Sequence, residues 1–370
     1  MKNDPVTSSW FRSFSSRKKL FPMGAALILV VAGLFGCLAI YSSRTLSDQP
    51  LFFVFKQMLW LFPGIAVFLA AAAVPFRFYR RVAPWWFLLS VISLIAVYLF
   101  GHEINHMRGW FSLGHVHFQP SEFAKCSLLL YLCVYCGARK ELSFLRLAYL
   151  FLVSFGSMIL IMLEPDFGGA LMFFVAFILV IFLRGVRFHY ILAAFGFLAV
   201  SAAVFILFNE YALMRILGYL NPDGIFSASA WHIKQFQYTM AHGGWTGSDW
   251  GNALWSGAFL PYPHTDSLFA SIVESTGFAG GLIVIAGFVA MGIGFCVLSW
   301  DIRSGDDTRR FYVFSAGALY LIQALIHIGV NSVLLPPTGV TLPILSYGGS
   351  SLFSVMLAFG IAFSAANAKE

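Results

Sequence analysis

Long apolar runs alternate with shorter polar segments along almost the whole chain. Ten runs can be read, at residues 21–42, 51–74, 84–100, 124–138, 147–163, 167–183, 188–208, 267–299, 311–335 and 344–365. Most reach the roughly 17–25 residues that a helix needs to cross the hydrocarbon core of a bilayer. The run at 124–138 is short, so we expect its helix to begin nearer Ser121. No alternating barrel pattern is present. The pattern predicts an all-α polytopic membrane protein with about ten transmembrane helices.

The charge distribution orients these helices. The chain is 59% hydrophobic and 11% charged, far below the charge content of a soluble domain. Most of its 23 Lys and Arg residues fall in the N-terminal tail and in every second connector, around 77–81, 139–146, 184–187 and 303–310. The positive-inside rule makes this side the cytoplasm, with both chain ends on it. The net charge of +7 therefore reflects topology and does not indicate a nucleic acid partner.

No linker divides the chain into separate domains. Residues 1–20 form a Ser-rich, basic tail that we expect to be cytoplasmic, and residues 21–370 form a single membrane domain. The first apolar run is too long for the core of a signal peptide. Four connectors of interest face the extracytoplasmic side, and the unusual motifs gather in them: 101–123, 164–167, 209–266 and 336–345. The large loop 209–266 lies between the seventh and eighth helices.

Asp266 closes this large loop in LPYPHTD, immediately before an apolar run resumes. A carboxylate at the lip of a membrane segment can have a shifted pKa, as catalytic acids and bases require. Glu274 lies inside the apolar run, where an acid is costly and a functional role is the default hypothesis. A structural alternative stays open, because Thr265 or Asp266 could simply cap the following helix.

The connector 101–123 carries a second set of charges. Glu122 and Lys125 are three residues apart in PSEFAK, which opens the fourth helix, and so share a helix face. An acid and a base inside the membrane should pair, either as a structural ion pair or as part of a substrate site. Arg108, beside Trp110, is a candidate phosphate ligand. The His residues nearby lack the carboxylates or Cys that would complete a zinc site.

Three further outer motifs interrupt regular helix. In MLEPDFGGA, Asp166 is suited to cap the following helix. The loop 209–266 is rich in Trp and Gly, which predicts interfacial helices and close backbone approaches. In LLPPTGVTLPILSYGGSS, prolines prevent regular helix, and such backbone must be buried in protein or line a cavity. We expect this segment and Asp266 to meet at one extracytoplasmic cavity, with Ser346 facing it and Arg108 at its rim.

Together these motifs resemble the SEDS family of bacterial envelope proteins, represented by RodA and FtsW. The resemblance extends over essentially the whole chain and rests on RGWFSLG, FQPSEFAK, EPDFGGA, RILGYLNPD, LPYPHTDSLFASIVESTG and LPPTGVTLPILSYGGSS. It implies a location in the bacterial inner membrane and polymerisation of lipid II into glycan strands linked to undecaprenyl pyrophosphate. It also implies, as partners, a class B penicillin-binding protein that crosslinks the strands and other membrane proteins of the elongation machinery.

The resemblance assigns the essential aspartate of the family to Asp266 and its PSExxK pair to Glu122 and Lys125. The chain departs from the family pattern at Ser267, Ser275 and His327, among other positions. Because the aspartate and the ion pair are retained, we expect activity to persist.

Within the family, the short N-terminal tail, the little sequence beyond the last helix and WHIKQ around His232 favour the RodA branch, which acts in elongation. The alternative is the FtsW branch, which acts in division.

The resemblance also suggests a mechanism. As general base, Asp266 would take a proton from the 4-hydroxyl of the incoming GlcNAc, which attacks the donor anomeric carbon with inversion. Arg108, with Lys125, would stabilise the departing pyrophosphate, and Glu274 and Ser346 are further substrate-binding candidates. No motif specifies a cofactor, although Mg or Mn could share this role.

Two other classes of function compete with this prediction. A flippase or transporter for lipid-linked precursors would also need intramembrane charges, but it would not need a base at the outer lip. A scaffold that only activates a transpeptidase would keep the fold and tolerate loss of Asp266.

Overall fold

The computed structural model describes residues 21–47, 49–104, 107–114, 116–224, 228–302 and 305–368. Its helices are α2 (Phe21–Ser43), α3 (Pro50–Ala73), α4 (Phe76–Phe100), α5 (Pro120–Gly137), α6 (Phe144–Leu163), α7 (Phe167–Leu183), α8 (Phe188–Phe208), α9 (Glu210–Leu220), α10 (Ala228–Gly243), α11 (Leu254–Ala258), α12 (Leu268–Trp300), α13 (Asp307–Asn331) and α14 (Gly349–Asn367). Its strands are β1 (His102–Ile104), β2 (Met107–Leu113) and β3 (Val116–Phe118).

The ten apolar runs correspond to the ten long helices α2 to α8 and α12 to α14. Among the described residues, eight of these are long and apolar enough to cross a membrane, and α7 is a shorter apolar helix. The fourth helix begins at Pro120, close to the predicted start, because proline suits the first turn of a helix. The prediction of an all-α polytopic membrane protein is therefore confirmed for the membrane part of the chain.

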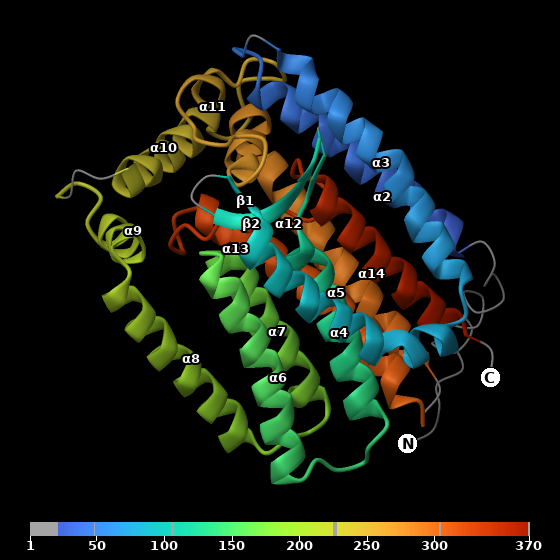
Figure 1. Ribbon diagram of the computed structural model, residues 1–370. Helices are drawn as coiled ribbons and strands as arrows, with labels where there is room; N and C mark the ends of the chain where they lie inside the picture. Colours follow the sequence, from blue (N-terminus) through green and yellow to red (C-terminus); the bar gives the residue numbers. More distant parts are fainter. Residues whose placement is uncertain are drawn as a thin grey trace, which may run out of the picture.

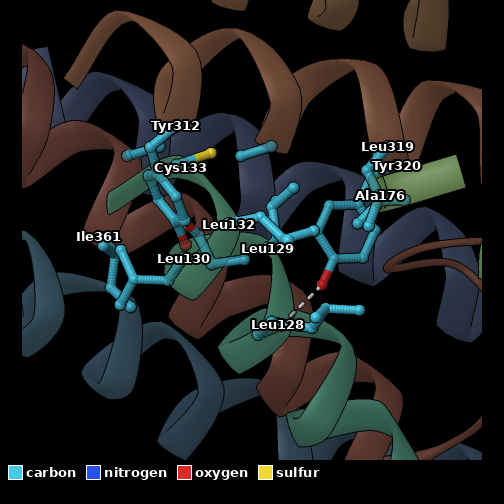
Figure 2. Close-up of a cluster of buried hydrophobic side chains, with 14 of the residues drawn as sticks. Leu128, Leu129, Leu130, Leu132, Cys133, Ala176, Tyr312, Leu319, Tyr320 and Ile361 are labelled. Carbon is cyan, nitrogen blue, oxygen red and sulfur yellow. Dashed lines mark hydrogen bonds between the residues drawn. The ribbon is translucent and has the colours of Figure 1, made fainter. Parts of the chain in front are cut away.

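The centre of the bundle is formed by α5, α13 and α14. In the most apolar 18-residue stretch of each helix, 67% of the residues are buried in α13 and 72% in α14. Figure 2 shows the Tyr312 and Tyr320 rings of α13 among leucines of α5, and both rings are fully buried. In contrast, only 11% of the residues in the corresponding stretch of α8 are buried. Figure 1 shows α8 at one side of the bundle. Since lipid covers apolar surface as well as protein does, an exposed helix of this kind is expected only in a membrane.

One end of the bundle collects the basic connectors. Arg80 forms an ion pair with Asp306 at 2.8 Å, and Arg184 forms one with Asp307 at 3.1 Å. Arg309 donates hydrogen bonds to the last carbonyls of the described chain, those of Ala365 and Ala368. The connectors that the charge count places in the cytoplasm therefore do lie together at one end.

The opposite end carries a small antiparallel sheet with strand order β1-β2-β3. Phe111 pairs with Phe118 in this sheet, and Ser112 pairs with His117. The sequence prediction was of an all-α protein, without strands in the connector 101–123. Its alternation of apolar and polar residues, period two, is the pattern of a strand, which accounts for the difference.

The large loop folds as helices, as predicted for it. Figure 1 shows α8 running up to α9, with α10 and α11 returning the chain to the upper end of α12. The glycines of the loop approach α12 closely: a Cβ at Gly243 or at Gly247 would collide with the α12 backbone. Gly277, inside α12, has a φ of 72°, and the Phe278 N–H donates to the Gly244 carbonyl at 2.9 Å. Glycine at these positions lets the loop dock on a kink in the long helix.

Candidate functional site

Three of the outer connectors and the start of α14 are joined by hydrogen bonds near the start of α12. The Ser346 hydroxyl donates to the carbonyl of Thr265 at 2.7 Å, and the Tyr347 N–H donates to the carbonyl of His264 at 2.9 Å. The Gln119 N–H donates to the Ser350 hydroxyl at 3.0 Å. Segments far apart in the sequence therefore meet beside Asp266.

Asp266 precedes α12 but does not cap it. The helix N-cap, Ser267, makes no side-chain capping bond. Two side chains of α13 perform this task instead: His327 Nε2 accepts from the Phe269 N–H, and Asn331 Oδ1 accepts from the Ala270 N–H at 3.0 Å. Because the first amides of α12 are satisfied by α13, the Asp266 carboxylate is left available for chemistry.

Two parts of the chain lie against Asp266, one at its backbone and one at its carboxylate. The Asn331 side-chain amide donates to its carbonyl oxygen at 3.0 Å. On the other side, Gly339 lies so close that an added Cβ would be 3.8 Å from Asp266 Oδ2. His327 was noted above as a departure from the family pattern. Its second ring nitrogen, Nδ1, lies 2.7 Å from the Val340 carbonyl, so it ties the broken segment to α13 while its Nε2 supports α12.

The pKa of Asp266 is raised to about 7. Burial is the largest cause, and the negative charge of Asp166 raises it further, while the positive charge of Arg215 lowers it. A carboxylate with a pKa near neutrality is well matched to general acid–base catalysis at physiological pH. The environment of Asp266 therefore suits a proton acceptor.

Arg215, on α9, was missed as a functional candidate, although it lies in the RILGYLNPD motif. Its charge lowers the pKa of Asp266, of Asp166 and of His232, so it lies among these three groups. An arginine on the outer side of a membrane protein, where basic residues are scarce, is a signal that sequence reasoning could have used.

Asp166 combines two roles. Its Oδ1 accepts from the Gly169 N–H at 2.7 Å and caps α7, as predicted. Burial raises its pKa to about 6, and the charges of Glu122, Lys125 and Arg215 also act on it. The capping residue of α7 is therefore also a part of the charged cluster next to Asp266.

Glu122 and Lys125 form the predicted ion pair, with Lys125 Nζ 2.9 Å from Glu122 Oε2. Each partner has a second hydrogen bond: Lys125 donates to Gln323 Oε1, and Glu122 accepts from the Ser354 hydroxyl. The Gln323 amide in turn donates to the carbonyl of Thr341 at 3.0 Å. The pair thus joins α5 to α13, to α14 and to the broken segment.

Arg108 lies exposed on β2. The charged groups that shift the pKa of Asp266 are Arg215 and Asp166, and Arg108 is not one of them. Its placement at the rim of the site stays a prediction. Next to it, an added Cβ at Gly109 would lie 3.2 Å from Glu164 Oε2. Glu164 is fully buried, and neither of its carboxylate oxygens has a hydrogen-bond partner among the described residues.

Glu274 has a different task from the substrate binding proposed for it. It is fully buried, and its carboxylate accepts hydrogen bonds from the Trp255 N–H at 2.8 Å, from the N–H and the hydroxyl of Ser256, and from His242 Nδ1. A carboxylate satisfied in this way cannot also bind a ligand in this conformation. Glu274 instead fastens α10 and α11 to α12, which corrects the sequence prediction.

Metal ligands do not gather at this site. Across the ranges of the chain that the structure describes, no group of three or more His, Cys, Asp or Glu side chains is placed to hold a metal ion. His106 and His115 of the outer connector lie outside those ranges. The positively charged side chains that act on Asp166 are Lys125 and Arg215.

Comparison with known proteins identifies relatives over nearly the whole chain. The family model of cell cycle proteins that covers FtsW, RodA and SpoVE matches residues 21–370. The chain is 34% identical over 319 residues to a probable peptidoglycan glycosyltransferase FtsW from Saccharophagus degradans, covering 81% of this chain and 79% of that protein. It is 32% identical over 351 residues to a protein of the same name from Hahella chejuensis, covering 92% and 87%.

Solved structures share the fold. A chain in a structure reported under the words "Structural coordination of polymerization and crosslinking by a peptidoglycan synthase complex" superposes with a TM-score of 0.77 at 26% identity, covering 93% of this chain and 97% of that one. The rod shape determining protein RodA of Thermus thermophilus superposes with a TM-score of 0.69 at 23% identity, covering 93% and 95%.

Proposed function

This chain belongs to the FtsW, RodA and SpoVE family of cell cycle proteins, and we propose that it is a peptidoglycan glycosyltransferase in which Asp266 is the general base. Its curated relatives bear the name of this enzyme. The observation that carries the proposal is the state of the Asp266 carboxylate. It is partly buried, it does not cap α12, and its pKa is about 7. The substrate is lipid II, and the product is a glycan strand linked to undecaprenyl pyrophosphate.

In the reaction, the 4-hydroxyl of the acceptor GlcNAc attacks the anomeric carbon of the donor. The hydroxyl proton passes to an Asp266 oxygen as the new glycosidic bond forms, and the bond to the lipid pyrophosphate breaks with inversion. The leaving pyrophosphate carries the negative charge away. A base whose pKa lies near the working pH is deprotonated often enough to accept the proton and basic enough to hold it.

Cationic side chains stabilise the leaving group. Arg215 is the strongest candidate, since its charge already acts on both Asp266 and Asp166. Lys125, held by Glu122 and Gln323, would contribute if the ion pair opens, and Arg108 would meet the anion at the outer surface. A divalent cation, Mg or Mn, bound with the pyrophosphate would add to the same stabilisation. Removal of divalent ions with EDTA tests that part of the proposal.

A membrane-anchored transpeptidase is the proposed partner. The solved structural relative is part of a peptidoglycan synthase complex described as coordinating polymerisation and crosslinking. A class B penicillin-binding protein has the second of these activities, and the exposed apolar helices of the bundle offer it a surface within the membrane. Other membrane proteins of the elongation machinery are proposed to join this complex.

Within this proposal, the more specific role is glycan polymerisation during elongation of the cell wall. It is supported by WHIKQ, which resembles the RodA loop and brings His232 Nε2 to 3.4 Å from Ser267 Oγ, next to Asp266. The curated relatives are named FtsW, so the division role is the alternative. A fluorescent fusion distinguishes the two roles, since it would follow the cylindrical wall in the first case and gather at the septum in the second.

One assay separates the enzyme from a flippase and from a scaffold. The purified protein and its partner are incubated with labelled lipid II, and the products are resolved on a gel. Polymer formed in the presence of a penicillin that blocks the transpeptidase supports the enzyme. Movement of lipid II across vesicles without polymer supports the flippase, and neither activity supports the scaffold.

A further inference from the structure

A cavity of about 470 Å³ lies at the connector between α2 and α3, apart from the proposed catalytic carboxylate. It is lined by Arg44, Leu46, Ser47, Gln49, Phe52 and Phe53. Nothing in the proposed glycosyl transfer uses these residues. By the alternation of the connectors this end of α3 is extracytoplasmic, so the cavity opens at the outer surface of the membrane.

Among the described residues that line the cavity, Arg44 is the one charged side chain. Its Nε is buried and has no hydrogen-bond partner in the part of the chain that the structure describes. Its guanidinium lies over the Phe53 ring, 4.9 Å from the ring centroid. A guanidinium has five donors in a planar fork that suits phosphate, and a buried donor without a partner is unusual in a folded protein. The unsatisfied donor at this cavity therefore points to an anionic ligand. Asp48, between Ser47 and Gln49, lies outside the described residues.

Two further features favour an anion here. The cavity lies at the N-terminus of α3, whose N-cap residue Gln49 makes no side-chain capping bond. Pro50 has no N–H and the Phe52 N–H donates to the Gln49 carbonyl, so the helix dipole is the feature of this end that favours negative charge. Lys56, in the second turn of α3, lies over the Phe52 ring at 4.4 Å from its centroid and adds a second positive charge at this end.

The surroundings of the cavity are those of an amphiphilic ligand. Phe52 is 43% exposed, Phe55 is 61% exposed and Leu51 is 48% exposed, all on the first turns of a membrane span. Apolar surface at this depth contacts lipid chains, whereas Arg44 lies where headgroups lie. The combination of a cation, a helix N-terminus and an apolar wall matches a phosphate group attached to a lipid tail.

We propose that this cavity binds the phosphate of an anionic lipid headgroup from the outer leaflet, with Arg44 as its main ligand. This inference goes beyond the proposed glycosyl transfer and does not depend on it. The bound headgroup would lie close to the segment that carries Asp266. The Phe53 and His264 rings are in contact, tilted at 38° with centroids 4.2 Å apart, and the Phe53 ring also meets the Tyr347 ring edge to face.

The same contacts suggest a consequence of binding. The pKa of His264 is lowered to about 4, mainly by burial and in addition by the positive charge of Arg44. His264 Nδ1 is buried without a hydrogen-bond partner. A phosphate on Arg44 would offset the charge that His264 experiences. Occupancy of the cavity is thus transmitted, through Phe53 and His264, to the residues just before Asp266.

Native mass spectrometry of the purified protein tests the binding site. The protein is titrated with phosphatidylglycerol and with phosphatidylcholine, and the affinity of the first bound lipid is measured for each. We expect phosphatidylglycerol to bind about tenfold more tightly to the wild type, because the ammonium group of phosphatidylcholine offsets the attraction of its phosphate to a cation, and Arg44→Gln to abolish this preference by removing the cation. Arg44→Lys, which keeps the charge but loses the fork, should give an intermediate preference.

The matched control is Arg187→Gln, which removes an exposed arginine at the cytoplasmic end and should leave the preference intact. Equal binding of the two lipids to the wild type would overturn the proposal, as would an unchanged preference in Arg44→Gln. If that variant does not fold, the wild-type preference and Arg44→Lys still decide. An excess of inorganic phosphate should not displace phosphatidylglycerol. Displacement would show a site for free phosphate and overturn the lipid assignment.

Discussion

The Ser346 hydroxyl donates a hydrogen bond of 2.7 Å to the carbonyl oxygen of Thr265, the residue before Asp266. The same hydroxyl accepts from the Leu342 N–H at 2.9 Å. One side chain thus fixes the segment that carries the proposed base to the proline-broken segment before α14. Ser346, a substrate-binding candidate in the sequence, is better described as a positioning residue, because its hydroxyl is engaged with backbone on both sides.

Ser346→Ala should therefore lower kcat about tenfold with little change in KM, because small displacements of a catalytic group are costly while substrate contacts are retained. The measurement is the rate of lipid II polymerisation at several substrate concentrations. Ser364→Ala is the control, since that hydroxyl bonds to the Val74 carbonyl at the cytoplasmic end of the bundle. An unchanged kcat in Ser346→Ala would exclude the positioning role.

Exchanging Glu122 and Lys125 should restore stability that either single substitution removes. Lys125 is 3% exposed and Glu122 16%, so loss of one partner leaves a buried charge and costs about 3–5 kcal/mol if burial is complete. Gln323 can turn its amide toward a carboxylate at position 125, and the Ser354 hydroxyl can accept from a lysine at position 122. Melting temperatures of Glu122→Lys, Lys125→Glu and the double variant test this. A double variant as unstable as the sum of the single ones would mean that the two charges are not coupled.

Two substitutions should move the pH profile of kcat/KM in opposite directions. Because the Arg215 charge lowers the pKa of Asp266, Arg215→Gln should raise it and shift the acidic limb to higher pH. Because the Asp166 charge raises the pKa of Asp266, Asp166→Asn should shift that limb to lower pH. Asn at this position still has an oxygen to cap α7. Shifts of the same sign in both variants would contradict the proposed electrostatics.

Glu164→Gln should stabilise the protein at alkaline pH. Burial raises the pKa of Glu164 from 4.5 to about 8, with a further contribution from Asp166. Between these two values the folded chain holds a proton that the unfolded chain has lost, so stability falls as the pH rises through this window. The Gln variant lacks this penalty, and its advantage in melting temperature should grow from pH 5 to pH 8. Glu141→Gln, at an exposed acid, should show no such trend, and a constant difference for Glu164→Gln would refute the prediction.

Local signals in the sequence predicted much of this fold. The length of the apolar runs gave the ten long helices, and Pro120 with Ser121 marked the start of α5. The prolines of the segment 336–345 marked the break before α14. The spacing of Glu122 and Lys125 was sufficient for their ion pair, because residues three apart share a helix face.

The rest of the site depends on contacts that no local pattern encodes. Arg215 reaches Asp266 only because α9 lies over the outer end of the bundle, and that position is set by the docking of α10 on α12. Glu274 resembled a functional acid by its depth alone. Its carboxylate accepts hydrogen bonds from Trp255 and Ser256 because the loop 209–266 folds back onto α12, and the spacing of residues in the sequence does not reveal this.

The rate of lipid II polymerisation by Asp266→Asn tests the central claim most directly. Asparagine is nearly isosteric but cannot accept the proton, so the rate should fall on the order of 10²-fold or more while folding and membrane insertion are retained. Asp249→Asn is the matched control in the same loop: Asp249 is exposed and has a φ of 69°, which Asn also tolerates. It should polymerise at the wild-type rate. Near-normal polymer from a well-folded Asp266→Asn protein would contradict the assignment of Asp266 as the catalytic base.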